Sequence, residues 1–272
     1  MSTLIPEFRN VGAAETRSPL LLTRKVTKIY PTREGRDVLA VEDISFFLAA
    51  GEFVSVVGSS GCGKTTLMKL IAGLFPPSAG EIVYCGQPVK RAQRGMGIVF
   101  QTPVLLPWLT VLENALLPIR VLRLNRAEAE ARVKDLLALV GLSGFEHTYP
   151  FELSGGMQQR AAIIRSLIHE PHLLLMDEPF GALDALSREQ LNIELQRIWL
   201  THRKTVFFIT HSITEAVFLS DRVLVMSNRP GRIVKELAIP FERPRDFDIT
   251  TQADFGRYVH EIRQLLGGSK DA

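Results

Sequence analysis

The stretch GSSGCGKT at 58–65 decides the fold expected for this chain, because of the segments on either side of it. A short apolar run, FVSVV at 53–57, precedes it, and the apolar-periodic segment TLMKLIAGL at 66–74 follows it. Continuous apolar runs are typical of buried parallel strands, and apolar residues three and four positions apart are typical of helices. The stretch is therefore predicted to be a loop that leads from a strand into a helix.

The small residues and the single lysine of this loop favour phosphate binding. Glycine has no Cβ, so Gly58, Gly61 and Gly63 can take positive φ and let backbone N–H groups approach an anion closely. The following helix adds unpaired N–H groups and a partial positive charge at its start. Lys64 supplies a full charge to the outer phosphates, and the Thr65 hydroxyl can ligate Mg²⁺. The residues predicted to bind the nucleotide here are Gly58, Ser59, Ser60, Gly61, Cys62, Gly63, Lys64, Thr65 and Thr66.

The rest of the chain predicts an α/β fold. Further short apolar runs resemble parallel strands, and helix-like segments separate them: the runs are LLLM at 173–176, TVFFIT at 205–210 and VLVM at 223–226. Two longer segments, 20–30 and 38–48, have the alternation of antiparallel strands. The predicted fold is a P-loop NTPase core with a parallel sheet, an N-terminal antiparallel β subdomain and an inserted helical subdomain.

The helical pattern NRAEAEARVKDLLALVGL at 125–142 marks the insertion, because no strand candidate lies near it. A terminal helix is predicted around 253–266. The expected organisation is a flexible segment at 1–19, a core domain at 20–235 with its helical subdomain at about 102–165, and a tail at 236–272.

Composition excludes several classes of protein. The chain has 272 residues, of which 46% are hydrophobic, so it can bury a substantial core. A net charge of +3 does not indicate a nucleic-acid partner. Cys62 and Cys85 are too few for a disulfide framework and favour a reducing, cytoplasmic compartment. No run approaches the roughly 20 apolar residues of a membrane span.

Acidic and imidazole groups follow two of the predicted strands. Asp177 and Glu178 come directly after LLLM, and His211 follows TVFFIT. The carboxyl ends of parallel strands meet at one edge of the sheet, where ligands bind in open α/β folds. Asp177 is therefore predicted to serve the Mg²⁺ shell and Glu178 to polarise the attacking water. An ordinary helix N-cap is the alternative for the two acids.

A second candidate anion site is LSGGM at 153–157. Ser154 is a natural N-cap, and Gly155 and Gly156 let a ligand approach the backbone. One nucleotide cannot be held by both sites from the same side, since the phosphate loop already wraps one face. A head-to-tail dimer resolves this, with each LSGGM facing the γ-phosphate held by the partner. A capped helix without a ligand is the alternative.

In combination, these motifs resemble the nucleotide-binding subunit of an ABC transporter: GSSGCGKT, Gln101, LSGGM, LLLMDEP, ALD at 182–184 and His211, in this order. The resemblance covers about residues 20–230. It implies that Tyr30 stacks on adenine, that Gln101 contacts Mg²⁺ and relays contacts to the membrane partner, and that His211 holds the γ-phosphate. It places Asp184 at the dimer seam. The cofactors implied are ATP and Mg²⁺.

Met157 stands where the most familiar form of the signature has Gln. The Met form, with PWLTVLEN at 107–114, MDEPFGALDALSRE at 176–189 and RPGRI at 229–233, is similar to the importer ATPases for nitrate, taurine and alkanesulfonates. That branch implies a second ATPase subunit, transmembrane permease subunits and, indirectly, a solute-binding protein. It also implies a peripheral position at the cytoplasmic face of the inner (plasma) membrane. A soluble ABC-type ATPase not linked to transport and an exporter motor stay open as alternatives.

Three further expectations concern partners and reactivity. The apolar stretch at 103–119, which contains Trp108, is either a groove for a helix of a membrane subunit or core of the helical subdomain. The thiol of Cys62 is expected to lie near the bound nucleotide, where alkylation would inhibit. A basic tail is expected to be a solvated face, to face lipid or to regulate the dimer; its members are Arg229, Arg232, Arg243 and Arg245.

Overall fold

The computed structural model describes residues 19–31, 35–181 and 183–267. The flexible segment expected at the N-terminus lies, apart from Pro19, outside the described residues, and so does Ala182 of the ALD motif. Within the described ranges no helix is both long and apolar enough to cross a membrane.

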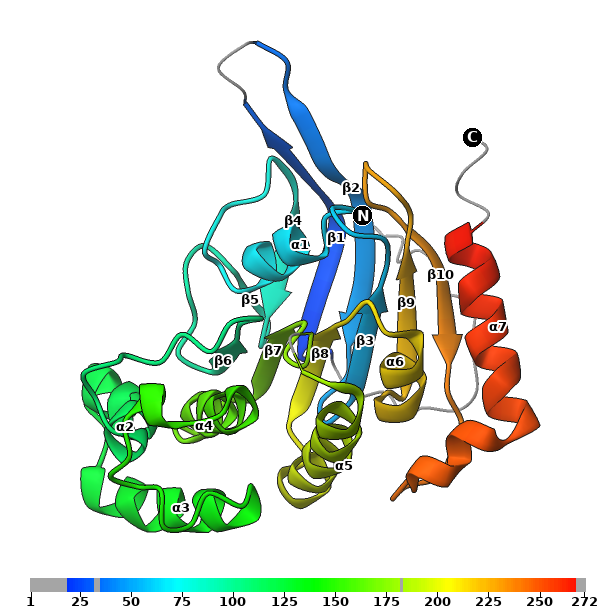
Figure 1. The fold of residues 1–272 in the computed structure, drawn as a ribbon. Helices are drawn as coiled ribbons and strands as arrows, with labels where there is room; N and C mark the ends of the chain where they lie inside the picture. Colours follow the sequence, from blue (N-terminus) through cyan, green and yellow to red (C-terminus); the bar gives the residue numbers. More distant parts are fainter. Residues whose placement is uncertain (1–18, 32–34, 182, 268–272) are drawn as a thin grey trace.

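A six-stranded sheet forms the centre of the molecule, with the strand order β10-β9-β3-β8-β7-β6 (Figure 1). The strands from β9 to β6 are parallel, and β10 pairs antiparallel with β9 at the edge. Every residue of β3, β7 and β8 is buried, as expected for strands covered on both faces. The bounds are β3 Phe53–Val57, β6 Met96–Val99, β7 Leu173–Asp177, β8 Thr205–Ile209, β9 Arg222–Met226 and β10 Ile233–Ala238.

A second, antiparallel sheet has the order β2-β1-β4-β5. The predicted pairing of β1 with β2 is confirmed, from Leu21 opposite Leu48 to Tyr30 opposite Val38. The sequence analysis did not identify β4, β5, β6 or β10. The bounds are β1 Leu21–Tyr30, β2 Val38–Leu48, β4 Ala79–Tyr84 and β5 Gln87–Pro88.

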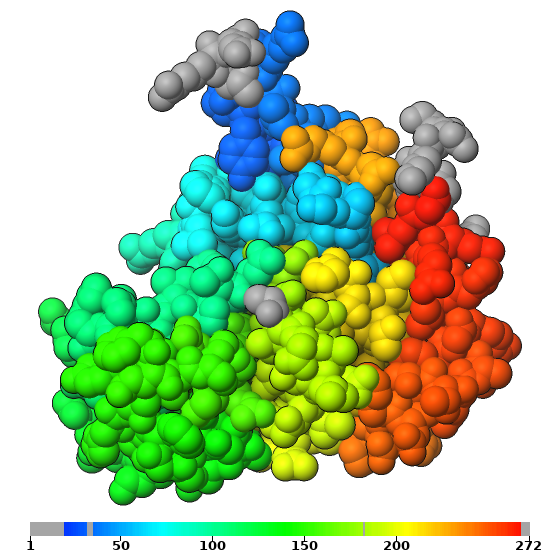
Figure 2. All heavy atoms as spheres, viewed as in Figure 1, coloured from blue at the N-terminus to red at the C-terminus, as the bar shows by residue number. Residues whose placement is uncertain are grey.

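The helices in the described residues cover both faces of the central sheet, and three of them form a lobe at its side (Figures 1 and 2). This helical subdomain consists of α2, α3 and α4, as the sequence predicted. Side chains cap several helix starts, including Thr110 with its capping box, Asn125 and Ser212. The bounds are α1 Lys64–Ile71, α2 Val111–Leu122, α3 Arg126–Leu139, η1 Pro150–Glu152, α4 Gly155–Leu167, α5 Ala185–His202, α6 Ile213–Leu219, η2 Phe247–Thr251 and α7 Ala253–Gly267.

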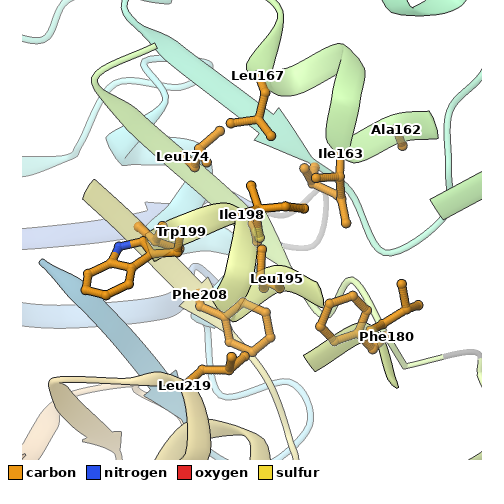
Figure 3. Packing of buried hydrophobic residues seen from close by; sticks show 14 of the residues in the cluster. Ala162, Ile163, Leu167, Leu174, Phe180, Leu195, Ile198, Trp199, Phe208 and Leu219 are labelled. Carbon is orange, nitrogen blue, oxygen red and sulfur yellow. The ribbon is translucent and has the colours of Figure 1, made fainter. Parts of the chain in front are cut away.

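Two hydrophobic clusters pack against opposite faces of the central sheet. Along β3, Phe53 and Val57 belong to one cluster, and Val54 and Val56 belong to the other. The first cluster joins the sheet to the helical subdomain and to α5, α6 and α7. Figure 3 shows the part of this cluster where α4 and α5 pack against β7 and β8. The second joins it to α1 and to the antiparallel sheet. The carboxyl ends of the parallel strands are thereby held at a fixed position relative to both subdomains.

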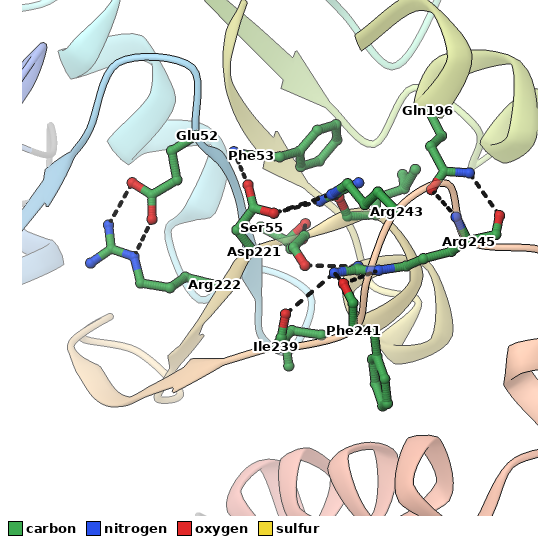
Figure 4. A network of polar contacts seen from close by, with 12 residues as sticks. Glu52, Phe53, Ser55, Gln196, Asp221, Arg222, Ile239, Phe241, Arg243 and Arg245 are labelled. Carbon is green, nitrogen blue, oxygen red and sulfur yellow. Dashed lines mark hydrogen bonds and ion pairs between the residues drawn. The ribbon is translucent and has the colours of Figure 1, made fainter. Parts of the chain in front are cut away.

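The C-terminal region packs against the core domain, because residues of α7 belong to the first hydrophobic cluster. β10 extends across the boundary expected at 235, so the sheet continues to Ala238. The basic-tail expectation is wrong for Arg243 and Arg245, because both guanidinium groups are buried (Figure 4). Arg245 donates to five backbone carbonyls, those of Val217, Phe218, Ser220, Ile239 and Phe241. Buried charges persist in proteins only when they are paired or hydrogen-bonded, and these acceptors meet that need.

Arg245 also joins the tail to α5. Its backbone N–H donates to the side-chain oxygen of Gln196 at 2.7 Å, and its carbonyl accepts from the same amide at 2.7 Å. Arg243 pairs with Asp221 at 2.9 Å and lies 4.3 Å from the ring of Trp199. Burial lowers the pKa of Arg245 to about 10. The segment 243–245 therefore fastens the C-terminal region to α5 and to the end of α6.

Candidate nucleotide-binding site

The phosphate loop joins β3 to α1, as predicted from GSSGCGKT. Gly61 and Gly63 have positive φ, at 76° and 111°. A Cβ on Gly63 would also lie 2.7 Å from the carbonyl oxygen of Ala40, so a side chain is excluded there by both space and conformation. Gly58 differs: it is needed for close packing, since a Cβ would lie 2.7 Å from Cys62 Sγ.

Lys64 is buried beneath this loop. Its Nζ donates to the carbonyl oxygens of Gly58 at 2.9 Å and Ser59 at 3.0 Å, and it lies 4.0 Å from Glu178 Oε1. The ammonium group is thus already held against the loop by these two carbonyl groups. A phosphate in the loop would meet a positioned positive charge rather than a free side chain.

The Thr65 hydroxyl donates to Asp177 Oδ1 across 3.1 Å. This bond joins the start of α1 to the end of β7, two elements that are far apart in the sequence. Burial raises the pKa of the Asp177 carboxyl, and the hydrogen bond from Thr65 opposes part of that rise. The pair places a hydroxyl and a carboxylate next to each other at the phosphate loop.

Glu178 lies next to groups that reach it from different parts of the chain. His211 Nδ1 is 3.2 Å from its Oε2, and Gln101 Nε2 donates to the same oxygen at 3.5 Å. Its backbone N–H donates to the carbonyl of Ile209 at the end of β8. The structure therefore brings Glu178, His211, Gln101 and Lys64 together at one edge of the sheet.

A cavity of about 290 Å³ opens at this edge. Two of its lining residues, Ala40 and Arg229, were not among the predicted site residues. Arg229 was assigned to the basic tail, and its place here depends on how β9 sits beside β3, which no local pattern reveals. The lining consists of Ala40, Ser60, Gly61, Gly63, Lys64, Thr65, Thr66, Gln101, Glu178 and Arg229.

Tyr30 is outside this lining. It ends β1, half-buried, and the ammonium of Lys28 lies 5.3 Å from the centre of its ring.

The expectation of a Cys62 thiol open to alkylation at the nucleotide cavity is contradicted, because the thiol is buried, although its Sγ lies 4.0 Å from Lys64 Nζ. The side chain is 1% exposed and belongs to the second hydrophobic cluster, beneath the loop. Its neighbours Gly61 and Gly63 line the cavity, whereas the Cys62 side chain does not. Cys62 is therefore a core residue.

The signature LSGGM borders a separate cavity of about 380 Å³, whose lining includes Ser154, Gly155, Gly156 and Asp184. None of the residues that line it also lines the cavity at the phosphate loop. Ser154 caps α4 through a bond from the Met157 N–H at 3.3 Å. Asp184 caps α5, and hydrogen bonds from Ser187 lower the pKa of its exposed carboxyl.

The core interpretation of the stretch at 103–119 holds for part of it, and the docking interpretation stays a prediction. Leu105 is buried in the core of the helical subdomain. Trp108 is 69% exposed and Val104 is 54% exposed. The stretch thus contributes to the core and also presents apolar side chains at the surface.

A phosphate loop joined by hydrogen bonding to an acidic pair at the end of another strand of the same sheet defines a P-loop nucleotide-binding protein. Residues 41–181 match the model of the ABC transporter family. The chain belongs to the ABC transporter family.

Related proteins match the sequence of this chain over most of their own length. The chain is 45% identical to the taurine import ATP-binding protein of Rhizobium johnstonii, over 89% of this chain and 94% of the relative. It is 45% identical to the nitrate import ATP-binding protein of Synechococcus elongatus, over 90% and 89%. A solved dimeric ATP-binding cassette in a post-hydrolysis state, bound to ADP and Pi, matches with a TM-score of 0.72 and 30% identity, over 82% of this chain and 100% of that one.

Proposed function

We propose that this protein binds and hydrolyses ATP as the motor subunit of an ABC importer for a small anion such as nitrate, a sulfonate or taurine. One observation carries the hydrolytic part: Glu178 lies within 4.0 Å of Lys64 and 3.2 Å of His211, at the mouth of a glycine-rich phosphate loop. A base, a cation and an imidazole are thereby gathered where the terminal phosphate of ATP would lie.

In the proposed reaction Glu178 accepts a proton from the attacking water, and His211 contacts the γ-phosphate. Lys64 gives up its hydrogen bonds to the carbonyl groups of Gly58 and Ser59 and donates to phosphate oxygens instead. These oxygens are stronger acceptors because they carry negative charge. Gln101, already next to Glu178, is placed to orient the water and the acid.

The residues present fit Mg²⁺. A small, hard cation prefers oxygen ligands and keeps several waters, so it needs few protein groups. The Thr65 hydroxyl supplies one oxygen, and Asp177 beside it supplies a carboxylate that acts through water. The described residues contain no cluster of three or more His, Cys, Asp or Glu side chains that could hold a metal. When bound, Mg²⁺ would offset charge on the β- and γ-phosphates.

The working unit is proposed to be a head-to-tail dimer with a second ATPase subunit. Ser154, Gly155 and Gly156 line a cavity distinct from the phosphate-loop cavity, so they need a second chain to reach a nucleotide. Asp184 lines the same cavity as Ser154, which supports its place at the dimer seam. The related cassette of known structure is itself a dimer.

Transport is supported by the relatives, whose names include taurine import, nitrate import and aliphatic sulfonates import. The exposed side chains of Val104 and Trp108 offer a docking surface for a permease subunit. A solute-binding protein would act through that permease, and the subunit would sit at the cytoplasmic face of the inner (plasma) membrane. Tyr30 is proposed to stack on adenine. No observation favours a soluble ATPase unlinked to transport or an exporter motor.

The test is Lys64→Ala. A charge-assisted contact to phosphate contributes roughly 1.5–3 kcal/mol, so this variant should bind ATP more weakly and lose hydrolysis. Lys235→Ala is the matched control, since Lys235 is exposed on β10 and outside the cavity lining. Equal turnover in the wild type and in Lys64→Ala, measured as phosphate release with MgATP, would refute the proposal.

A further inference from the structure

A second loop, residues 227–232 with the sequence SNRPGR, braces the phosphate loop from outside; we refer to it as the bracing loop. The Ser59 hydroxyl donates to Asn228 Oδ1 at 2.5 Å, and the guanidinium of Arg229 donates to the carbonyl of Gly61 at 3.0 Å. These bonds connect the loop after β9 to the loop after β3.

Close backbone packing fixes the bracing loop in place. A Cβ on Gly231 would lie 2.2 Å from the carbonyl oxygen of Cys62. The Gly231 N–H donates to Ala40 at 3.0 Å, and the Gly231 carbonyl accepts from the N–H of Glu42 at 2.9 Å. The backbone next to Arg229 therefore has little freedom, and the arginine side chain projects from a rigid base.

The sheet topology tells which side of the phosphate loop Arg229 occupies. β3 lies between β9 and β8 in the strand order, and β7 follows β8. Glu178 follows β7 and His211 follows β8, whereas Arg229 follows β9 on the other side of β3. Arg229 thus lines the same cavity as Glu178 but approaches it from the opposite flank of the phosphate loop.

The charge of Arg229 has no acidic partner among the described residues, and the bond to Gly61 is the hydrogen bond found for its guanidinium there. A guanidinium carries five N–H donors, so most of them remain for a ligand. Arg232, in the same loop, differs from Arg229 both in its ion pairing and in its position relative to the cavity. It pairs with Glu42 at 2.6 Å and does not line the cavity.

We propose that Arg229 is a further nucleotide-binding residue, whose guanidinium contacts the α-phosphate from the flank opposite to Glu178. The inference rests on the proposed function, because it needs a nucleotide in the phosphate loop. Guanidinium and phosphate form charge-assisted, often bidentate hydrogen bonds, which suit a planar donor on a rigid base. Lys64 and Arg229 then hold the phosphate chain from two sides, Lys64 at the outer phosphates and Arg229 at the inner one.

The experiment measures dissociation constants for ATP and for ADP by titration calorimetry, with magnesium, on the full chain. Arg229→Ala should raise both constants by about tenfold, because both nucleotides carry the α-phosphate. Arg232→Ala removes the same charge from the same loop and should change them by less than about twofold. Arg229→Lys keeps the charge without the planar fork and should fall between the wild type and Arg229→Ala.

Other results of this experiment would decide against the assignment of Arg229. Unchanged constants in Arg229→Ala, a rise for ATP but not for ADP, or an equal rise in Arg232→Ala would overturn the assignment. Unfolding temperatures without nucleotide, measured for all variants, separate a binding loss from misfolding; a misfolded Arg229→Ala leaves the decision to Arg229→Lys. Wild-type protein that binds neither nucleotide would overturn the proposed function and this assignment together, whereas unchanged Arg229→Ala overturns this assignment alone.

Discussion

His211 Nδ1 lies 3.2 Å from Glu178 Oε2, and the Glu178 N–H donates to the carbonyl of Ile209, two residues before His211. Side chain and backbone thus connect the same two strand ends. Glu178 also has a positive φ of 45°, a conformation that is costly for a residue with a Cβ. The proposed base and the proposed γ-phosphate ligand are therefore positioned relative to each other by the sheet itself.

Glu178→Gln should stop hydrolysis and preserve ATP binding, because the amide is nearly isosteric and lacks only basicity. ATP should then accumulate uncleaved between two chains. In light scattering with MgATP, the variant should approach twice the chain mass of 30.3 kDa. A variant that stays monomeric at high protein concentration would contradict the proposed dimer.

Ser154→Arg on the Glu178→Gln background should abolish that dimer. Ser154 sits with both glycines in an open cavity, and a bulky cation there would block the approach of a partner's nucleotide. The matched control is Arg126→Ala, which changes an exposed charge at the start of α3. Persistence of the MgATP-dependent dimer in the double variant would remove the signature from the interface.

Asp177→Asn should stabilise the nucleotide-free protein while impairing hydrolysis. Burial raises the folded-state pKa of Asp177, so above that pKa the carboxylate disfavours the folded state, and the penalty disappears as pH falls below the unfolded-state value. Asparagine removes the penalty and can still accept from Thr65. We expect an unfolding temperature about 2–4 °C higher at pH 7.5, a gain that shrinks toward pH 4. Asp135→Asn, at an exposed site on α3, should not reproduce the gain.

Arg245→Ala should destabilise the protein by about 3–5 kcal/mol, because it leaves buried carbonyls without donors. Arg257→Ala, which removes an exposed pair with Asp254 on α7, should change the free energy of unfolding by about 0.5 kcal/mol or less. Urea unfolding of the two variants beside the wild type gives both values. A similar, small effect in both would mean that the buried network contributes little.

One thiol should react rapidly in the native protein. Cys85 is exposed and Cys62 is buried, so a colorimetric thiol reagent should label one equivalent quickly and the second only after unfolding. Cys85→Ser should lose the fast phase. Fast labelling that persists in this variant and is slowed by MgATP would restore Cys62 to the nucleotide surface.

Much of the fold could be predicted from the sequence because its signals are local. FVSVV, LLLM, TVFFIT and VLVM are continuous apolar runs, and each proved to be a buried parallel strand. β4 to β6 were missed because they are short or rich in glycine and polar residues. β10 was missed because IVKELA has charges on its exposed side and follows a segment dominated by Arg and Pro.

The same distinction applies to the site: its local motifs could be predicted, and its long-range contacts could not. The phosphate loop and the acidic pair after β7 are contiguous motifs, so their grouping at one sheet edge could be predicted. Arg229 could not, because its position depends on strand order and on the packing of Gly231 against Cys62. The burial of Arg243 and Arg245 was missed for a related reason: a charge pattern does not reveal the carbonyls that will surround it.

The chain's two tryptophans differ in solvent exposure, so their fluorescence can report on two different parts of the protein. Trp199 is 5% exposed, beside Arg243, whereas Trp108 is 69% exposed on the surface proposed for the permease. Indole emission shifts to shorter wavelength when water is excluded, so the red-shifted part of the spectrum belongs to Trp108. Docking of a membrane subunit should therefore be visible as a blue shift in unlabelled protein, while Trp199 reports separately on the integrity of the C-terminal region.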